Sequence, residues 1–121
     1  MGQEKSKVIE ETEKLINDGY FEIGENKYTI NKMPFRKGRK VYTYFTSIQK
    51  KIQESNFDFM ETDKFLEIEE AICKYIDYNG SSIYAINTEK HFEKYPSDYD
   101  NFIITSLMIF SYPFIAGLSG K

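Results

Sequence analysis

The C-terminal part of the chain contains a long stretch without charge. From Phe102 to Ala116 no residue is charged, in a sequence in which 29% of the residues are. This stretch is shorter than the about 20 residues that a membrane-spanning helix requires, and Pro113 would break or kink it. A helix that is apolar on all sides is usually buried. We therefore expect no membrane span, but a core helix over residues 97–111 that is followed by an apolar tail, residues 112–121.

The composition is that of an ordinary globular protein with an unusual share of aromatic residues. A chain of 121 residues is long enough to bury one core without disulfides or metals. It has ten Tyr and ten Phe but no Trp, and such side chains are common in cores and in protein interfaces. The single cysteine, Cys73, excludes an intramolecular disulfide, and the N-terminus has no apolar signal-peptide segment. We expect a cytoplasmic protein.

The net charge of −3 combines a slightly basic first half with an acidic second half. A nucleic-acid-binding domain usually carries a broad basic surface, whereas the basic residues here gather in one short cluster on a chain with a pI of about 5.2. We interpret the cluster as a solvated helix start and expect no nucleic-acid partner. Its members are Lys32, Arg36, Lys37, Arg39 and Lys40.

The spacing of apolar residues predicts an α+β fold, a mainly helical small domain with one N-terminal β-hairpin. Residues 1–19 read as an amphipathic helix that ends at Asn17-Asp18-Gly19, and residues 20–121 read as a single globular domain. Within that domain we expect a hairpin over residues 20–30, because two alternating runs flank Gly24. The further helices are expected at about 36–54, 62–78, 88–95 and 97–111.

Three local signals set the expected ends of these helices. Thr62 is placed to cap the helix that follows it. Asn79-Gly80 reads as the C-terminal end of the same helix. Ser97, with Asp100 three positions later, resembles a capping box for the last helix.

The residues that usually perform catalysis are scarce. His91 is the only histidine, so a zinc site built on a pair of histidines is excluded. A thiolate pair of Cys73 with His91 is conceivable, but Cys73 stands beside Ile72 on an apolar helix face, where a cysteine is usually structural.

The acidic residues and glycines also lack a recognisable motif. The seven glycines form neither of the phosphate-binding patterns GxGxxG and GxxxxGK. Glu67, Glu69 and Glu70 read as a solvated helix face, and Asp98 and Asp100 suit a helix N-terminus rather than a calcium loop. We therefore expect a non-enzymatic protein with no catalytic residues, no cofactor and no metal.

The order of these segments resembles the tail assembly chaperones of long-tailed bacteriophages and of related prophage or phage-tail-like bacteriocin clusters. The resemblance is carried by MPFRKGRKVY, IDYNG, HFEKYPSDYDNFIITSLMIF and SYPFIAG, and it covers roughly residues 20 to 117. It implies a protein that binds the tape-measure protein, a long helical ruler, and keeps it in solution while tail-tube subunits polymerise. It also implies absence from the mature particle, and in many such phages a frameshift produces a longer second form.

Such a chaperone needs an apolar surface for amphipathic helices. The tail after the core helix is the candidate, and its predicted partner-binding residues are Tyr112, Phe114, Ile115 and Leu118. The tape-measure protein is the expected partner, with the tail tube protein as a further one and several chaperone copies on one client.

Two other classes of protein fit the same features. One is a permanent structural component of a tail or of a head–tail junction. The other is an immunity or antitoxin-like protein, whose acidic half would mask a basic toxin.

Overall fold

The computed structural model describes the backbone of residues 2–119, with side chains described for residue 7 and residues 9–115. Within this part of the chain the fold is α+β, as predicted, with five α-helices, two short 3₁₀ helices and a four-stranded antiparallel sheet. In chain order the elements are α1 (Gly2–Asp18), β1 (Tyr20–Ile23), β2 (Asn26–Ile30), α2 (Phe35–Gln53), η1 (Asp58–Glu61), α3 (Asp63–Lys74), β3 (Ile76–Tyr78), β4 (Ser81–Ser82), α4 (Thr88–Lys94), η2 (Pro96–Asp98) and α5 (Tyr99–Ser119).

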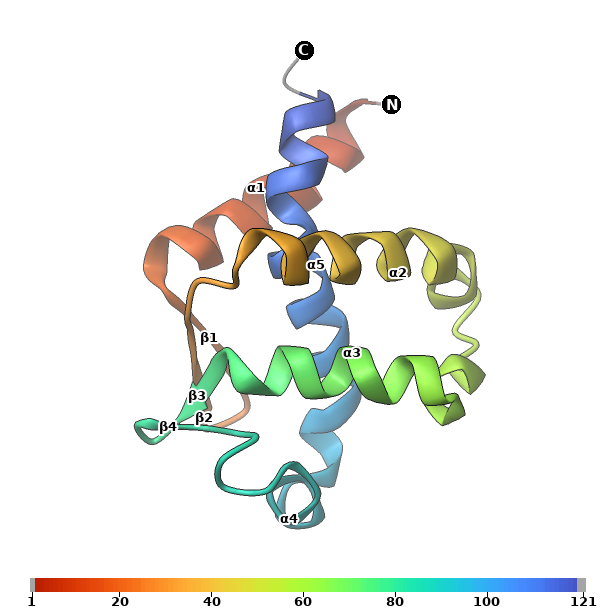
Figure 1. Cartoon of the computed structure of the whole chain (residues 1–121). Coiled ribbons are helices and arrows are strands. Elements are labelled where there is room, and N and C mark those ends of the chain that lie inside the picture. Colours follow the sequence, from red (N-terminus) through yellow and green to blue (C-terminus); the bar gives the residue numbers. More distant parts are fainter. Residues whose placement is uncertain (1, 120–121) are drawn as a thin grey trace.

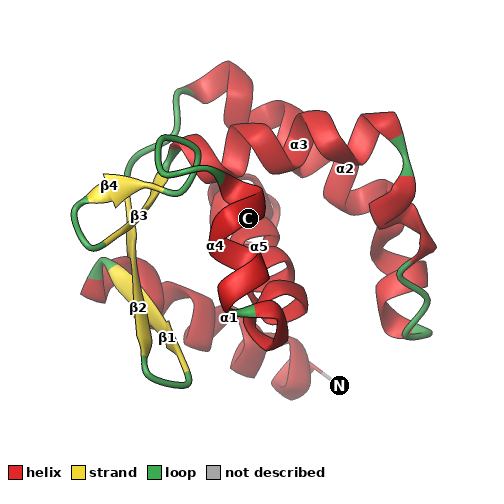
Figure 2. Ribbon diagram, turned by 90° about the horizontal axis from the view of Figure 1, so that it is seen from below, coloured by secondary structure: helices red, strands yellow, loops and turns green. Residues whose placement is uncertain are grey.

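Helix α5 is the centre of the fold. It runs through the middle of the molecule, and α2 and α3 cross it side by side (Figure 1). Helix α1 packs on α5 from another side, and the sheet lies beside the helices (Figure 2). Phe102, Ile103 and Leu107 are completely buried, so the expected core helix is confirmed. No described helix is both long enough and apolar enough to span a membrane.

The predicted N-terminal hairpin is present. Helix α1 ends at Asp18, and the following Gly19 adopts a φ of +83° while its amide donates to the Leu15 carbonyl. Strands β1 and β2 then pair in antiparallel fashion, with Phe21 opposite Tyr28 and their rings stacked at 5.4 Å. Both side chains are buried, and Tyr28 also lies against Phe102 of α5.

A second hairpin stands where the sequence predicts the end of a helix. Helix α3 ends at Lys74 rather than at residue 78, and Tyr78 pairs with Ser81 across a two-residue turn. Asn79 and Gly80 both have positive φ, 53° and 89°, which is the requirement of a type I′ hairpin turn. The interpretation of Asn79-Gly80 as a helix end was wrong. This hairpin joins the first one through β2 and β3, so the sheet order is β1-β2-β3-β4.

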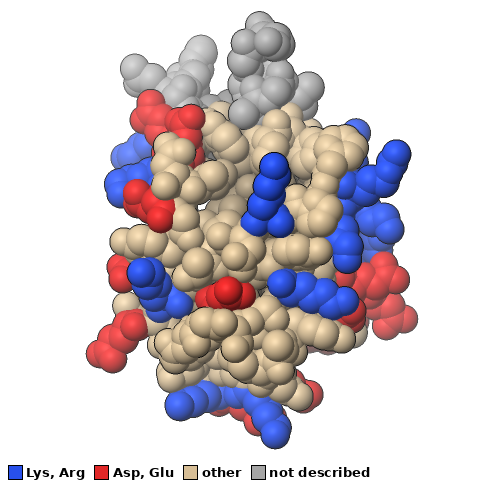
Figure 3. All heavy atoms as spheres, turned by 60° about the vertical axis from the view of Figure 1, so that its left-hand side comes forward, with Lys and Arg blue, Asp and Glu red and all other residues tan. Residues whose placement is uncertain are grey.

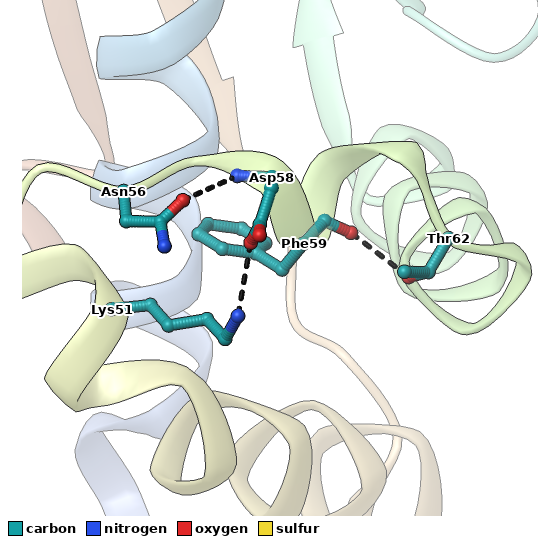
Figure 4. A network of polar contacts seen from close by, with 5 residues as sticks. All are labelled: Lys51, Asn56, Asp58, Phe59 and Thr62. Atoms are coloured by element: carbon teal, nitrogen blue, oxygen red, sulfur yellow. Dashed lines mark hydrogen bonds and ion pairs between the residues drawn. The ribbon is translucent and has the colours of Figure 1, made fainter.

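The connection between α2 and α3 is held by local contacts (Figure 4). Lys51 on α2 forms an ion pair of 3.0 Å with Asp58, whose own amide is bound by the Asn56 side chain. Phe59 is buried, and its carbonyl accepts the hydroxyl of Thr62. Thr62 also caps α3 as predicted, because its Oγ1 accepts the Phe65 amide.

The last helix differs from the prediction at both ends. Residues 96–98 form a 3₁₀ turn, so the capping box of Ser97 with Asp100 is not formed and Asp98 is buried instead. At the other end α5 continues through Pro113 to Ser119, whereas we expected it to stop near residue 111. A proline inside a helix removes one hydrogen bond, and here the helix that contains it also packs against α1 and α2. Residues 112–119 are therefore helix and not a separate tail.

Candidate functional site: an apolar groove between α1, α2 and α5

The described surface contains an open, mainly apolar groove of about 700 Å³. It lies where the end of α1, the β2–α2 connection, the first turn of α2 and the second half of α5 meet. In Figure 3, which brings the left-hand side of Figure 1 forward, much of this face is uncharged, with separate charged side chains both at its margins and near its middle. The lining residues are Ile16, Ile30, Asn31, Lys32, Met33, Pro34, Phe35, Gly38, Ile109, Phe110, Pro113 and Phe114.

Phe35 is the most exposed large apolar side chain among the described residues, with 68% of its surface accessible. It is the first residue of α2 and follows Pro34, whose φ of −58° directs the chain into the helix. Its helical position differs from that of the buried stripe, which contains Val41, Phe45 and Ile48. An exposed phenylalanine beside an apolar groove is typical of a surface that binds a partner.

Phe114 forms one wall of the groove and is held by α2. Its ring stacks on Tyr42 at 5.4 Å and meets Phe35 at 5.8 Å. The guanidinium of Arg39 stands 5.7 Å from the same ring. A Cβ atom at position 38 would lie 3.5 Å from the Phe114 ring, so the backbone of α2 at Gly38 lies close to this ring. Phe114 is thus a fixed part of the groove.

Pro113 is exposed and stands in the groove wall next to Phe114. Because proline has no amide hydrogen, the carbonyl of Ile109 loses the hydrogen bond that residue 113 would donate. Ile109 lines the same groove.

The basic cluster of the sequence is divided between two surfaces. Lys32 lines the apolar groove, and Arg39 stands at its edge over Phe114. Lys37 and Lys40 instead line a smaller hollow between α2 and α3, together with acidic residues of α3. The cluster is therefore not one continuous basic patch.

The four predicted partner-binding residues have different surroundings. Phe114 lines the groove. Tyr112 is half-buried and donates a hydrogen bond of 3.0 Å to Glu13 of α1, and this bond raises the pKa of its hydroxyl. Ile115 packs against the core, and the side chain of Leu118 lies outside the described residues. Only Phe114 is thus placed at the groove.

Sequence reasoning missed the other side of the groove, formed by Ile16, Met33, Pro34 and Phe35. One signal was present, because Phe35 is apolar but stands outside the helical stripe that begins at Val41. The remaining lining residues come from distant segments, and their meeting depends on the tertiary structure.

A buried polar network lies at the opposite end of β2. The Tyr28 hydroxyl donates to Asp98 at 2.8 Å and lies 2.9 Å from Nε2 of His91, which must carry the hydrogen of that second bond. Asn26 also donates to Asp98, and Tyr78 donates to Asn26. Burial lowers the pKa of His91 and raises that of Tyr28. The network connects β2 and β3 with α4 and η2, which is a structural arrangement.

The other reactive side chains also have surroundings that are typical of a structural role. Cys73 is completely buried, and burial raises the pKa of its thiol to about 12, so it is protonated at neutral pH. Tyr99 donates to Glu69, which connects α5 with α3. Among the described residues, no group of three or more His, Cys, Asp or Glu side chains is arranged to hold a metal ion.

Comparisons with protein-family models, curated proteins and solved structures give no match for this chain.

Proposed function

We propose that this protein is a phage tail assembly chaperone that binds the tape-measure protein and keeps it in solution while the tail tube assembles. The observation that carries the proposal is the open apolar groove with the exposed ring of Phe35 beside it. The order of sequence segments from MPFRKGRKVY to SYPFIAG supports the same family.

The groove has the form that a helical client requires. An amphipathic helix binds by inserting side chains at positions i, i+3 or i+4, and i+7 into an apolar groove. About 700 Å³ accommodates the side chains that one face of such a helix presents over a few turns, while the rest of the helix stays outside. A tape-measure protein repeats such faces along its length, so several chaperone copies bind one client through the same contact.

The site needs no catalytic group for this function. Capture and release depend on apolar contacts that the tube protein replaces as it polymerises around the ruler. The protein acts in the host cytoplasm, takes no cofactor and does not remain in the mature particle.

Co-expression with the cognate tape-measure protein tests the proposal. We expect the wild-type chain to raise the soluble yield of that protein and to co-purify with it. Phe35→Glu should abolish both effects, because it places a carboxylate at a contact that loses water on binding. Leu66→Glu is the matched control, since Leu66 is also an exposed apolar helix residue, with 51% of its surface accessible, but lies on α3 outside the groove.

Two results would contradict the proposal. One is a wild-type chain that neither binds nor solubilises the tape-measure protein. The other is detection of this chain in purified particles at a fixed copy number, which would favour a permanent tail or head–tail component.

A further inference from the structure

Two basic side chains stand at the groove. Lys32 is the only charged residue among those that line it. Arg39 stands at its edge, with its guanidinium 5.2 Å from the Tyr42 ring and 5.7 Å from the Phe114 ring. Within the described residues, no acidic side chain lines the groove.

Like several other exposed basic residues, these two cations have no carboxylate partner, in contrast to four lysines elsewhere in the described chain. Lys14, Lys51, Lys64 and Lys74 each form an ion pair with a nearby carboxylate. Neither Lys32 nor Arg39 has an ion-pair partner within the described part of the chain. Lys37 and Lys40 share their hollow with Glu67 and Glu70. The groove thus has two positive charges that the rest of the described protein does not neutralise.

We propose that the groove selects an amphipathic helix with acidic residues beside its apolar stripe, so that client carboxylates meet Lys32 and Arg39. This inference rests on the proposed function and specifies which segments of the client are bound. Arg39 is suited to the role, because its guanidinium already lies over aromatic rings and offers hydrogen-bond donors in a plane that matches a carboxylate.

Charge complementarity of this kind determines specificity and the rate of association more than the total affinity. A helix with lysines beside its stripe would place like charges against Lys32 and Arg39. The apolar side chains of the groove bind either helix, whereas the charges of Lys32 and Arg39 favour the acidic one. Because salt screens exposed charges, the discrimination should weaken as ionic strength rises.

Two synthetic peptides test the proposal directly. Both carry the same apolar stripe and are amphipathic helices, but one has Glu and the other Lys on both sides of the stripe. Their dissociation constants with the full chain are measured by fluorescence anisotropy at about 50 mM and about 300 mM salt, a range over which the screening length shortens markedly. We expect the wild-type chain to bind the Glu peptide at least about tenfold more tightly at low salt, with a smaller ratio at high salt.

Charge reversal at the groove is compared with charge reversal elsewhere. Lys32→Glu combined with Arg39→Glu should invert the preference, so that the Lys peptide binds more tightly. Lys50→Glu combined with Lys90→Glu changes the net charge equally at exposed positions outside the groove and should leave the preference unchanged. Circular dichroism of each variant verifies the fold before its binding is interpreted.

Equal binding of the two peptides by the wild-type chain, or a preference that the groove reversal leaves unchanged, would overturn the inference. A concentration-dependent dimer that Phe35→Glu dissociates would identify a second copy as the occupant and would also overturn it. Capture of the tape-measure protein with no effect of the groove reversal refutes this inference alone. Failure of the wild-type chain to capture the tape-measure protein refutes the proposed function.

Discussion

At the scale of single residues, the least ordinary environment is that of His91. Its side chain is 94% buried, being only 6% exposed, and it shares the Tyr28 hydroxyl with Asp98. Burial lowers the pKa of His91 and outweighs the opposing effect of Asp98, while Lys94 adds to the lowering. The folded protein therefore favours the neutral ring, with its Nε2 hydrogen donated to Tyr28.

This environment predicts a loss of stability in mild acid. Between the ordinary histidine pKa of 6.5 and the lower pKa of the folded state, the unfolded chain binds more protons than the folded chain. The free energy of unfolding should therefore fall as the pH drops below about 6.5. His91→Gln retains a donor for Tyr28 but does not titrate, so its stability should change less over the same range. Urea unfolding between about pH 5.5 and 7.5 measures the difference, because His91 is the only histidine.

Parallel pH profiles for His91→Gln and wild type would show that the neutral ring does not contribute to this pH dependence. A wild-type protein that becomes more stable in mild acid would contradict the buried, neutral assignment outright.

At the scale of secondary-structure elements, the second half of α5 has two roles. It continues the core helix past Pro113, and it forms a wall of the groove through Phe114. Because Phe114 stacks on Tyr42 and Ile115 packs against the core, a carboxylate at either position would disturb folding as well as binding. Phe35 is largely exposed, so a substitution at this position should affect binding without disturbing folding.

The contribution of this part of α5 to stability can be measured with two variants. Phe114→Ala should lower the free energy of unfolding by about 1–2 kcal/mol, less than for a fully buried phenylalanine, because the ring is only half-buried. Tyr112→Phe removes only the hydrogen bond to Glu13 at the surface and should change stability by less than about 0.5 kcal/mol. Chemical denaturation of both variants gives the comparison. Equal, negligible effects would mean that residues 112–115 do not contribute to the fold in solution.

The same element shows where sequence patterns were sufficient and where they were not. The burial of Phe102 and Ile103 followed from a run without charge, which makes a helix apolar on all sides. The passage of the helix through Pro113 did not, because it depends on contacts with α1 and α2 that the local sequence does not contain. The sequence Asn79-Gly80 indicated a change of chain direction, but this dipeptide occurs both at helix C-termini and in hairpin turns. The pairing of β3 with β2 favours the hairpin turn, and that pairing is a tertiary contact.

At the scale of the whole molecule, the groove depends on the packing of segments far apart in the sequence. Ile16 comes from α1, Met33 and Phe35 from the start of α2 and the connection before it, and Phe110 and Phe114 from α5. No periodicity within one segment indicates such a meeting. The sequence therefore predicted the fold class and one residue of the candidate site, Phe114, but not the groove itself.

The position of the client on the molecule is the central claim, and site-specific cross-linking tests it most directly. A photoreactive amino acid is placed at position 35 in one variant and at position 66 in another, and each is produced together with the cognate tape-measure protein. Both positions are exposed on helices, so the reactive group itself should not disturb either site. The account predicts that irradiation joins the tape-measure protein to position 35 and not to position 66. Cross-linking from position 66 alone, or equally from both positions, would contradict a client bound in the groove.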